Sequence, residues 1–144
     1  MKLKGLLFFI LILSTVSLKS QTQEADTTLI EKTVLNYIEN FFENKFEAMN
    51  ESLHPRLAKR GLNPDRTMSD DFPPAALKTL MENKQIFPVR AQKNKVTNIK
   101  VFRNAATATL VTGYPNTRWV EFIHLTKIEG KWKIINVFWE FFDK

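Results

Sequence analysis

The sequence predicts an α+β fold in which helices cover one face of an antiparallel sheet. Two patterns predict it. Apolar residues recur at helical spacing from residue 29 to residue 42, and strand-forming runs broken by turn residues fill the chain from residue 95 onward. The length of 144 residues, with 44% hydrophobic and 25% charged residues, suits one domain with one core.

The first 20 residues are expected to be a signal peptide rather than part of the fold. Two lysines precede an almost unbroken apolar run at residues 5–16, and a polar stretch follows it. This order is typical of secretory signals, and the run is shorter than the ~20 residues of a spanning helix. We expect cleavage near Ser20, although Leu18 is larger than the residue usually preferred there. An uncleaved signal anchor is the alternative. The mature chain, residues 21–144, would then be periplasmic or secreted.

Composition excludes several classes of function. Removing residues 1–20 takes away three lysines and lowers the net charge from +6 to +3, which argues against nucleic-acid binding. The chain has no cysteine, so disulfides, thiolate catalysis and lipidation at a cysteine are excluded. The two histidines, His54 and His124, are far apart in sequence, and no Gly-rich phosphate loop is present. We therefore predict neither a metal site nor a cofactor.

Three helices are predicted in the first half of the chain. A cap among residues 26–28 should start the first, which ends near Asn44 and carries Tyr37 in its apolar stripe. Residues 46–53 form a short second helix that stops before Pro55, because a proline disfavours helical geometry in the residue before it.

A loop should separate the second helix from the third. Residues 56–71 are polar and irregular, with at most a brief strand near Leu57. Asp71 is expected to cap the third helix, at residues 75–83, which turns Leu77, Leu80 and Met81 inward.

The second half is predicted to be a meander of strands. A short strand at residues 86–90 precedes a hairpin of residues 95–102 and 105–113, with Val101 opposite Ala106. The terminal hairpin turns at Glu129 and Gly130, since an acidic residue followed by glycine suits a two-residue turn.

The turn at Glu129 fixes a predicted register for the terminal hairpin. Ile128 pairs with Lys131, Leu125 with Ile134 and Glu121 with Phe138. Because side chains alternate between the two faces, the concave face receives Trp119, Glu121, Ile123, Leu125, Trp132, Ile134, Asn136 and Phe138. The outer face receives Arg118, Val120, Phe122, His124, Lys133, Ile135, Val137, Trp139 and Phe141.

Three segments resemble a known family: IEKTVLNYIENFFENKFEAMNESLHP, the turn at Asn104 into a strand, and the terminal FIHLTKIEGKWKIINVFW. In order and spacing they are similar to the putative lumazine-binding family of the nuclear transport factor 2-like superfamily, which includes ketosteroid isomerase and SnoaL-like cyclases. The resemblance spans residues 29–138. It implies a cone-shaped fold with a curved sheet around the first helix, a ligand pocket on the concave face, and dimers through the outer face. It supplies no catalytic motif.

Glu121 is the leading candidate for a functional group. On the concave face it would lie among apolar side chains, where desolvation raises the pKa of a carboxyl group towards that of a useful general base. The alternative places it at the rim, paired with Arg118 or a lysine. His54 could move a proton or bind a polar group, or it could be structural. Tyr37 could donate a hydrogen bond into the pocket, or it could belong to the core.

Two functions remain open. In the first, the protein is an exported binding or accessory module for a small apolar or aromatic molecule. In the second, it is an isomerase, cyclase or hydrolase with Glu121 as the base and His54 or Tyr37 as partner. The predicted ligand-binding residues are Tyr37, Phe41, His54, Trp119, Glu121, Trp132, Asn136 and Phe138. Phe122, Val137 and Trp139 are predicted to form a homodimer interface, because a monomer seldom leaves such an apolar patch bare.

Overall fold

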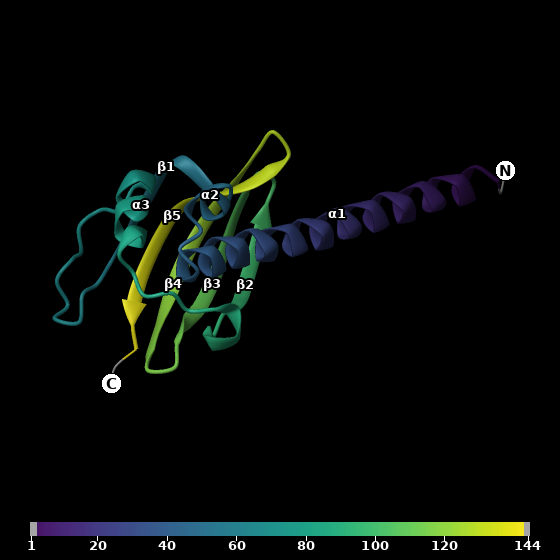
Figure 1. Ribbon diagram of the computed structural model, residues 1–144. Helices are drawn as coiled ribbons and strands as arrows, with labels where there is room; N and C mark the ends of the chain where they lie inside the picture. The colour runs from purple at the N-terminus through teal and green to yellow at the C-terminus, as the bar shows by residue number, and fades with distance from the viewer. Residues whose placement is uncertain (1–2, 143–144) are drawn as a thin grey trace.

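The computed structural model describes residues 3–142, with side chains described from residue 23. The C-terminal part of helix α1 (Leu3–Phe42) and helix α2 (Phe46–Asn50) lie on one face of a five-stranded sheet, and the N-terminal part of α1 extends beyond the sheet. The remaining elements are β1 (Leu53–Gly61), α3 (Pro74–Glu82), the 3₁₀ turn η1 (Val89–Ala91), β2 (Lys95–Phe102), β3 (Ala105–Tyr114), β4 (Thr117–Ile128) and β5 (Lys131–Phe141). The predicted α+β fold class is therefore confirmed (Figure 1).

The sheet has the strand order β1-β5-β4-β3-β2. Three hairpin-like pairs are antiparallel, and β1 pairs with β5 in parallel. The sequence interpretation placed a loop over most of β1 and allowed only a brief strand near Leu57, whereas β1 runs over nine residues. Pro55 lies within β1, which the sheet tolerates because β1 is an edge strand.

Helix α1 is continuous through the predicted cap at residues 26–28, so the expected helix start there is wrong. The hydroxyls of Thr27 and Thr28 donate to carbonyl oxygens four residues earlier, at 3.0 and 3.2 Å, as they do inside a helix. Asp26 is buried and accepts hydrogen bonds from Lys127 Nζ (2.7 Å) and Trp132 Nε1 (3.0 Å). It ties α1 to the terminal hairpin instead of capping it.

The predicted signal peptide falls partly on residues 1–2, which lie outside the described residues, and otherwise on the start of α1, whose side chains are not described. That prediction stays untested. In the part of the chain that the structure describes, no helix combines the length and apolar character needed to cross a membrane.

The elements between α1 and the sheet differ from expectation at three points. Helix α2 ends at Asn50, three residues early, because β1 begins at Leu53. Asp71 pairs with Arg60 at 2.6 Å and does not cap α3, whose Leu80 is exposed. Residues 86–90 form no strand and lead instead into the 3₁₀ turn η1.

The core lies between α1 and the concave face of the sheet. Helix α1 buries residues at helical spacing, and the sheet buries alternate residues of β3, β4 and β5. The fully buried members include Ile30, Val34, Tyr37, Ile38, Phe42, Leu110, Ile123, Ile134 and Val137.

A β-bulge in the terminal hairpin changes which residues of β5 face the core. The turn at Glu129 and Gly130 is as predicted, with both residues at positive φ (51° and 76°), and Leu125 lies opposite Ile134. The next pair is His124 with Asn136, so Ile135 is the extra residue. Beyond it Glu121 lies opposite Trp139, and the predicted pairing with Phe138 is wrong.

The bulge exchanges the predicted faces of the last part of β5. A shift of one residue moves every following side chain to the other face. Val137 and Trp139 therefore belong to the concave side, where Val137 is fully buried and Trp139 packs against the core. Asn136 and Phe138 lie on the outer side, opposite His124 and Phe122, whose side chains are exposed.

Candidate functional site

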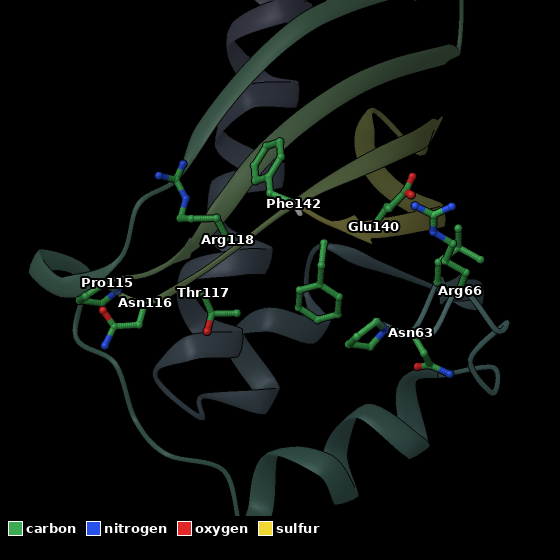
Figure 2. A pocket seen from close by; sticks show the side chains of 11 residues that line it. Asn63, Arg66, Pro115, Asn116, Thr117, Arg118, Glu140 and Phe142 are labelled. Atoms are coloured by element: carbon green, nitrogen blue, oxygen red, sulfur yellow. The ribbon is translucent and has the colours of Figure 1, made fainter. Parts of the chain in front are cut away.

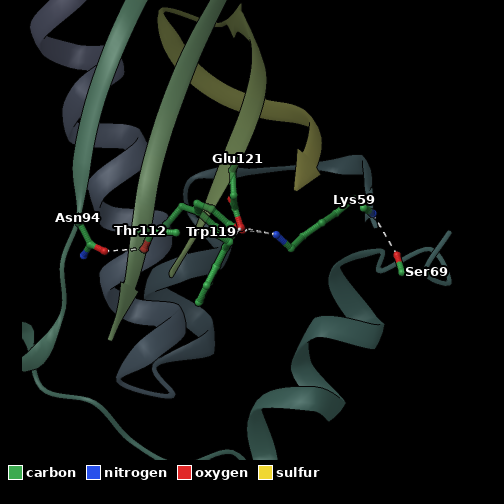
Figure 3. Close-up of polar contacts among 8 residues, drawn as sticks. Lys59, Ser69, Asn94, Thr112, Trp119 and Glu121 are labelled. Carbon is green, nitrogen blue, oxygen red and sulfur yellow. Dashed lines mark hydrogen bonds and ion pairs between the residues drawn. The ribbon is translucent and has the colours of Figure 1, made fainter. Parts of the chain in front are cut away.

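A buried polar cluster lies in the core where α1, β1 and β4 meet. It consists of Tyr37, Lys59, Trp119 and Glu121, which are 0%, 7%, 9% and 1% exposed. Figure 3 shows the carboxylate of Glu121 directed towards the Lys59 ammonium group, with Trp119 beside it. Alternation along β1 and β4 turns Lys59, Trp119 and Glu121 inward, and the helical stripe of α1 supplies Tyr37.

Hydrogen bonds connect all four members of this cluster. Lys59 Nζ donates to Glu121 Oε1 (2.8 Å) and to Tyr37 Oη (2.7 Å). Tyr37 Oη donates to Glu121 Oε2 (3.0 Å), and Trp119 Nε1 donates to Glu121 Oε1 (3.1 Å). The carboxylate of Glu121 thus accepts from three side chains and carries a charge matched by one ammonium group.

Burial and charge fix the protonation state of the phenol. Desolvation raises the pKa of Tyr37 well above 10.0, and the neighbouring Glu121 charge raises it further. Tyr37 is therefore a neutral hydrogen-bond donor at any physiological pH. Lys59 Nζ also lies 4.9 Å from the centroid of the Trp139 ring, a cation–π distance.

A cleft lies elsewhere, at the end of the sheet where β4 begins and β5 ends. This terminal cleft has a volume of about 800 Å³. Its lining comes from the β1–α3 loop, the β3–β4 turn and the last residues of β5 (Figure 2). The lining residues are Leu62, Asn63, Pro64, Arg66, Pro115, Asn116, Thr117, Arg118, Glu140, Phe141 and Phe142.

Local hydrogen bonds hold the β1–α3 loop in shape on one side of the terminal cleft. Asn63 N–H donates to Thr67 O (2.9 Å), and Arg66 N–H donates to Asn63 O (2.8 Å). The Asp65 carboxylate accepts from the N–H and the hydroxyl of Thr67, which lowers the Asp65 pKa. Arg66 consequently sits at a positive φ of 66°.

A contact between two aromatic rings connects the terminal cleft with the buried cluster. Phe141 lines the cleft, and its ring centroid lies 5.8 Å from that of Trp119. Trp119 in turn donates to Glu121. The cluster and the cleft are therefore neighbours joined by the contact between Trp119 and Phe141, and Glu121 does not line the cleft.

A second, smaller cleft of about 300 Å³ lies at the other end of the hairpin. Its lining combines α1 with the start of β5 and includes Lys32, Asn36, Lys131, Trp132 and Lys133. The Asn36 amide nitrogen is already occupied by Ala48 O and Ser52 Oγ, each at 2.8 Å.

The structure brings three predicted site residues together. Tyr37 and Trp119 each donate a hydrogen bond to the buried Glu121, so the inward orientation predicted for Glu121 is confirmed. Their role in ligand binding stays a prediction. Asn136 and Phe138 are not part of this group because of the bulge, and Asn136 Nδ2 lies 3.1 Å from His124 Nδ1 on the outer face.

The other predicted residues lie apart from the cluster. His54 is at the start of β1, and its Nδ1 accepts from Arg56 N–H (3.0 Å). Trp132 is held by Asp26 at the far end of the hairpin. Phe41 lies at the end of α1, where Lys84 Nζ approaches its ring to 4.4 Å. In the described part of the chain, no three His, Asp or Glu side chains gather as metal ligands.

Sequence reasoning missed Lys59 and the terminal cleft for one reason. Both depend on β1, whose parallel pairing with β5 places Lys59 beside Val137 and Gly61 beside Trp139. The available signal was that Leu57, Lys59 and Gly61 alternate with outward residues, as in a strand with one buried face. Because a charged lysine stands at one of the inward positions, this alternation does not look like that of a strand.

The complete fold and the sequence now identify a family. The profile of the putative lumazine-binding family matches residues 25–140, which is most of the chain. The chain belongs to this family. Among curated proteins, none matches the sequence.

Solved structures show that this family member has the fold of nuclear transport factor 2-like proteins. A nuclear transport factor 2-like protein of unknown function from Shewanella baltica superposes with a TM-score of 0.73, at 20% identity over 83% of this chain and 96% of that one. A ketosteroid isomerase-like protein from Erwinia carotovora gives 0.63, at 12% identity over 81% and 96%. A putative scytalone dehydratase from Novosphingobium aromaticivorans gives 0.64, at 17% identity over 86% and 89%. These likenesses show the fold, as the resemblance predicted.

Proposed function

We propose that this member of the putative lumazine-binding family is an exported module that binds a small apolar or aromatic molecule in the terminal cleft. The observation that carries the proposal is the cleft itself. Its volume of about 800 Å³ falls within the roughly 300–1,000 Å³ of small-molecule sites, and its lining mixes apolar rings with a few polar groups, as in such sites.

A cleft-filling variant tests this proposal. Thr117→Trp places an indole among the residues that line the cleft, whereas Thr79→Trp makes the same change on the exposed surface of α3. Native mass spectrometry of the purified protein should show a retained small molecule in the wild type and in Thr79→Trp, and none in Thr117→Trp. Equal retention by both variants contradicts the proposal.

The surroundings of Glu121 support binding without chemistry. A general base must come within hydrogen-bond reach of the proton that it removes. Glu121 instead accepts from Tyr37, Lys59 and Trp119, and it is not among the residues that line the cleft.

An enzyme of isomerase, cyclase or hydrolase type is the second candidate, and one contact favours it. Tyr37 and Glu121 share a hydrogen bond of 3.0 Å, which puts a phenol donor next to a carboxylate. The two candidates differ in the outcome of Glu121→Gln. If Glu121 is a base, this change lowers the rate by about 10²-fold or more. If the protein only binds, ligand affinity stays within about threefold of wild type, provided that the variant is folded by circular dichroism.

Export is proposed from the basic, apolar and polar order of residues 1–21. The intact mass of the protein recovered from the periplasm or the medium should correspond to residues 21–144. Recovery of the full-length chain in the membrane fraction would support the uncleaved anchor instead.

A homodimer through the outer sheet face is proposed with a revised set of residues. Phe122 is 49% exposed there, and Phe138 lies opposite it on the same face. Val137 and Trp139 leave the predicted interface because the bulge turns them inward. Sedimentation at micromolar concentration should show a dimer for the wild type and a monomer for Phe122→Ser; a wild-type monomer contradicts this part of the proposal.

A further inference from the structure

Two guanidinium groups and one carboxylate line the terminal cleft. They belong to Arg66, Arg118 and Glu140. Among the ion pairs of the described residues, none includes any of these three groups. Among the described lining residues the positive charges therefore outnumber the negative one, and no ion pair within the described part of the chain occupies the two arginines.

Arg118 is the better placed of the two arginines. Its Nε–H donates to Thr112 O (3.1 Å), and its backbone O accepts from Phe142 N–H (3.2 Å). The Nε edge of the guanidinium is thus fixed against β3. The N–H groups of the two terminal nitrogens are not used in this bond. A planar group held in this way loses little freedom when it binds a carboxylate with two parallel hydrogen bonds.

Arg66 is placed less favourably for this task. It is exposed, and it lies in the β1–α3 loop rather than on a strand. Figure 2 shows Arg66 and Glu140 on one side of the cleft, with Arg118 on the other. The Glu140 carboxylate reduces the attraction of that side for an anion.

Apolar side chains also line the terminal cleft. Phe141 and Phe142 are 38% and 52% exposed, although each could bury a large apolar area. Leu62, Pro64 and Pro115 complete the apolar surface.

We infer that the terminal cleft selects planar aromatic carboxylates, and that Arg118 binds the carboxylate while Phe141 and Phe142 contact the ring. This inference rests on the proposed function and narrows the ligand to one chemical class. It assigns Arg118 a binding role, whereas the sequence placed Arg118 on the outer face as a candidate partner of Glu121.

The test compares a charged probe with a neutral probe of the same shape. Binding of 2-naphthoate and of 2-naphthamide is measured by isothermal titration calorimetry with the full mature chain. The wild type should bind the naphthoate about tenfold more tightly or better, which is the scale of a charge-assisted hydrogen bond. Raising the salt concentration should weaken the preference.

Three variants locate the preference. Arg118→Gln should remove it and leave naphthamide affinity within about threefold. Arg103→Gln, which removes the same charge at the β2–β3 turn, should keep it. Arg118→Lys retains the charge but lacks the planar fork, so it should recover part of the preference; melting curves confirm that each variant is folded.

The outcomes separate this inference from the proposed function. One outcome would contradict only the inference: the wild type binds both probes equally, Thr117→Trp abolishes binding of both, and Arg118→Gln changes neither affinity. The cleft would then bind ligands, but without selecting a carboxylate. If neither probe binds and the chain instead associates through Phe142, with Phe142→Ser dissociating it, the cleft is a contact between copies and both proposals fail.

Discussion

Lys59→Met should be among the most destabilising single substitutions in this protein. It leaves the Glu121 carboxylate buried without its counter-charge, since Lys59 and Glu121 are 7% and 1% exposed and lie 2.8 Å apart. Removing one member of a buried ion pair typically costs about 3–5 kcal/mol of unfolding free energy. Hydrogen bonds from Tyr37 and Trp119 remain, so we expect a loss of about 3 kcal/mol.

Urea denaturation followed by far-ultraviolet circular dichroism measures this loss, with the midpoint and the slope fitted together. Arg60→Met is the matched control, because Arg60 is the next residue and its pair with Asp71 is exposed. An exposed pair contributes at most about 1 kcal/mol.

A double-mutant cycle shows whether the loss comes from the unpaired charge. Lys59→Met with Glu121→Leu removes both charges, and the double variant should be more stable than Lys59→Met alone. A loss below about 1 kcal/mol for Lys59→Met, equal to that of the Arg60 control, would refute the reasoning, since the cluster would then behave like a surface pair.

Three further predictions concern packing and pH. Gly61→Ala puts a Cβ at 2.3 Å from the Trp139 backbone oxygen and should lower the free energy of unfolding by about 1–3 kcal/mol, measured by urea denaturation. Gly130→Ala is the control, because nothing lies within 4 Å of its Cβ and the change tests positive-φ strain alone. Equal losses of stability in the two variants would contradict the packing argument. The Asp26 pKa is lowered from 3.8, mainly by its hydrogen bond with a lysine, so its stabilisation is present above pH 3.8 and is lost as the pH falls further. Asp26→Asn should therefore flatten the acid limb of a stability–pH curve, and an unchanged limb counts against this contact. Burial lowers the Lys84 pKa from 10.5 to about 8, so the unfolded chain binds more protons than the folded chain between these pH values, and stability should rise with pH across that window. Lys84→Met should remove this rise. A wild-type stability that does not rise with pH there would argue against a desolvated amine.

Local sequence patterns were sufficient to predict features that depend only on neighbouring residues in the chain. The turn at Glu129 was predicted because glycine after an acidic residue suits positive φ, and the structure has both residues there. The inward position of Glu121 followed from alternation along β4. Tyr37 followed from helical spacing in α1, where it is fully buried.

Features that depend on distant segments could not be read from such patterns. The parallel pairing of β1 with β5 joins residues about 80 positions apart. Without this pairing, the contact of Lys59 with Glu121 cannot be placed, nor can the β1–α3 loop that lines one side of the terminal cleft. The extra residue at Ile135 has no signature in a run of β-branched and aromatic residues, yet it exchanges Val137 with Phe138 between the faces.

The continuity of helix α1 gives the proposed removal of residues 1–20 a physical consequence. Cleavage would create a new helix start only a few residues before Asp26, whose bonds to Lys127 and Trp132 hold that turn against the sheet. Glu24 and Asp26 would then lie near the positive end of the helix dipole, where negative charge is stabilising. Maturation would thus convert two acidic residues from the interior of a long helix into the electrostatic start of a shorter one.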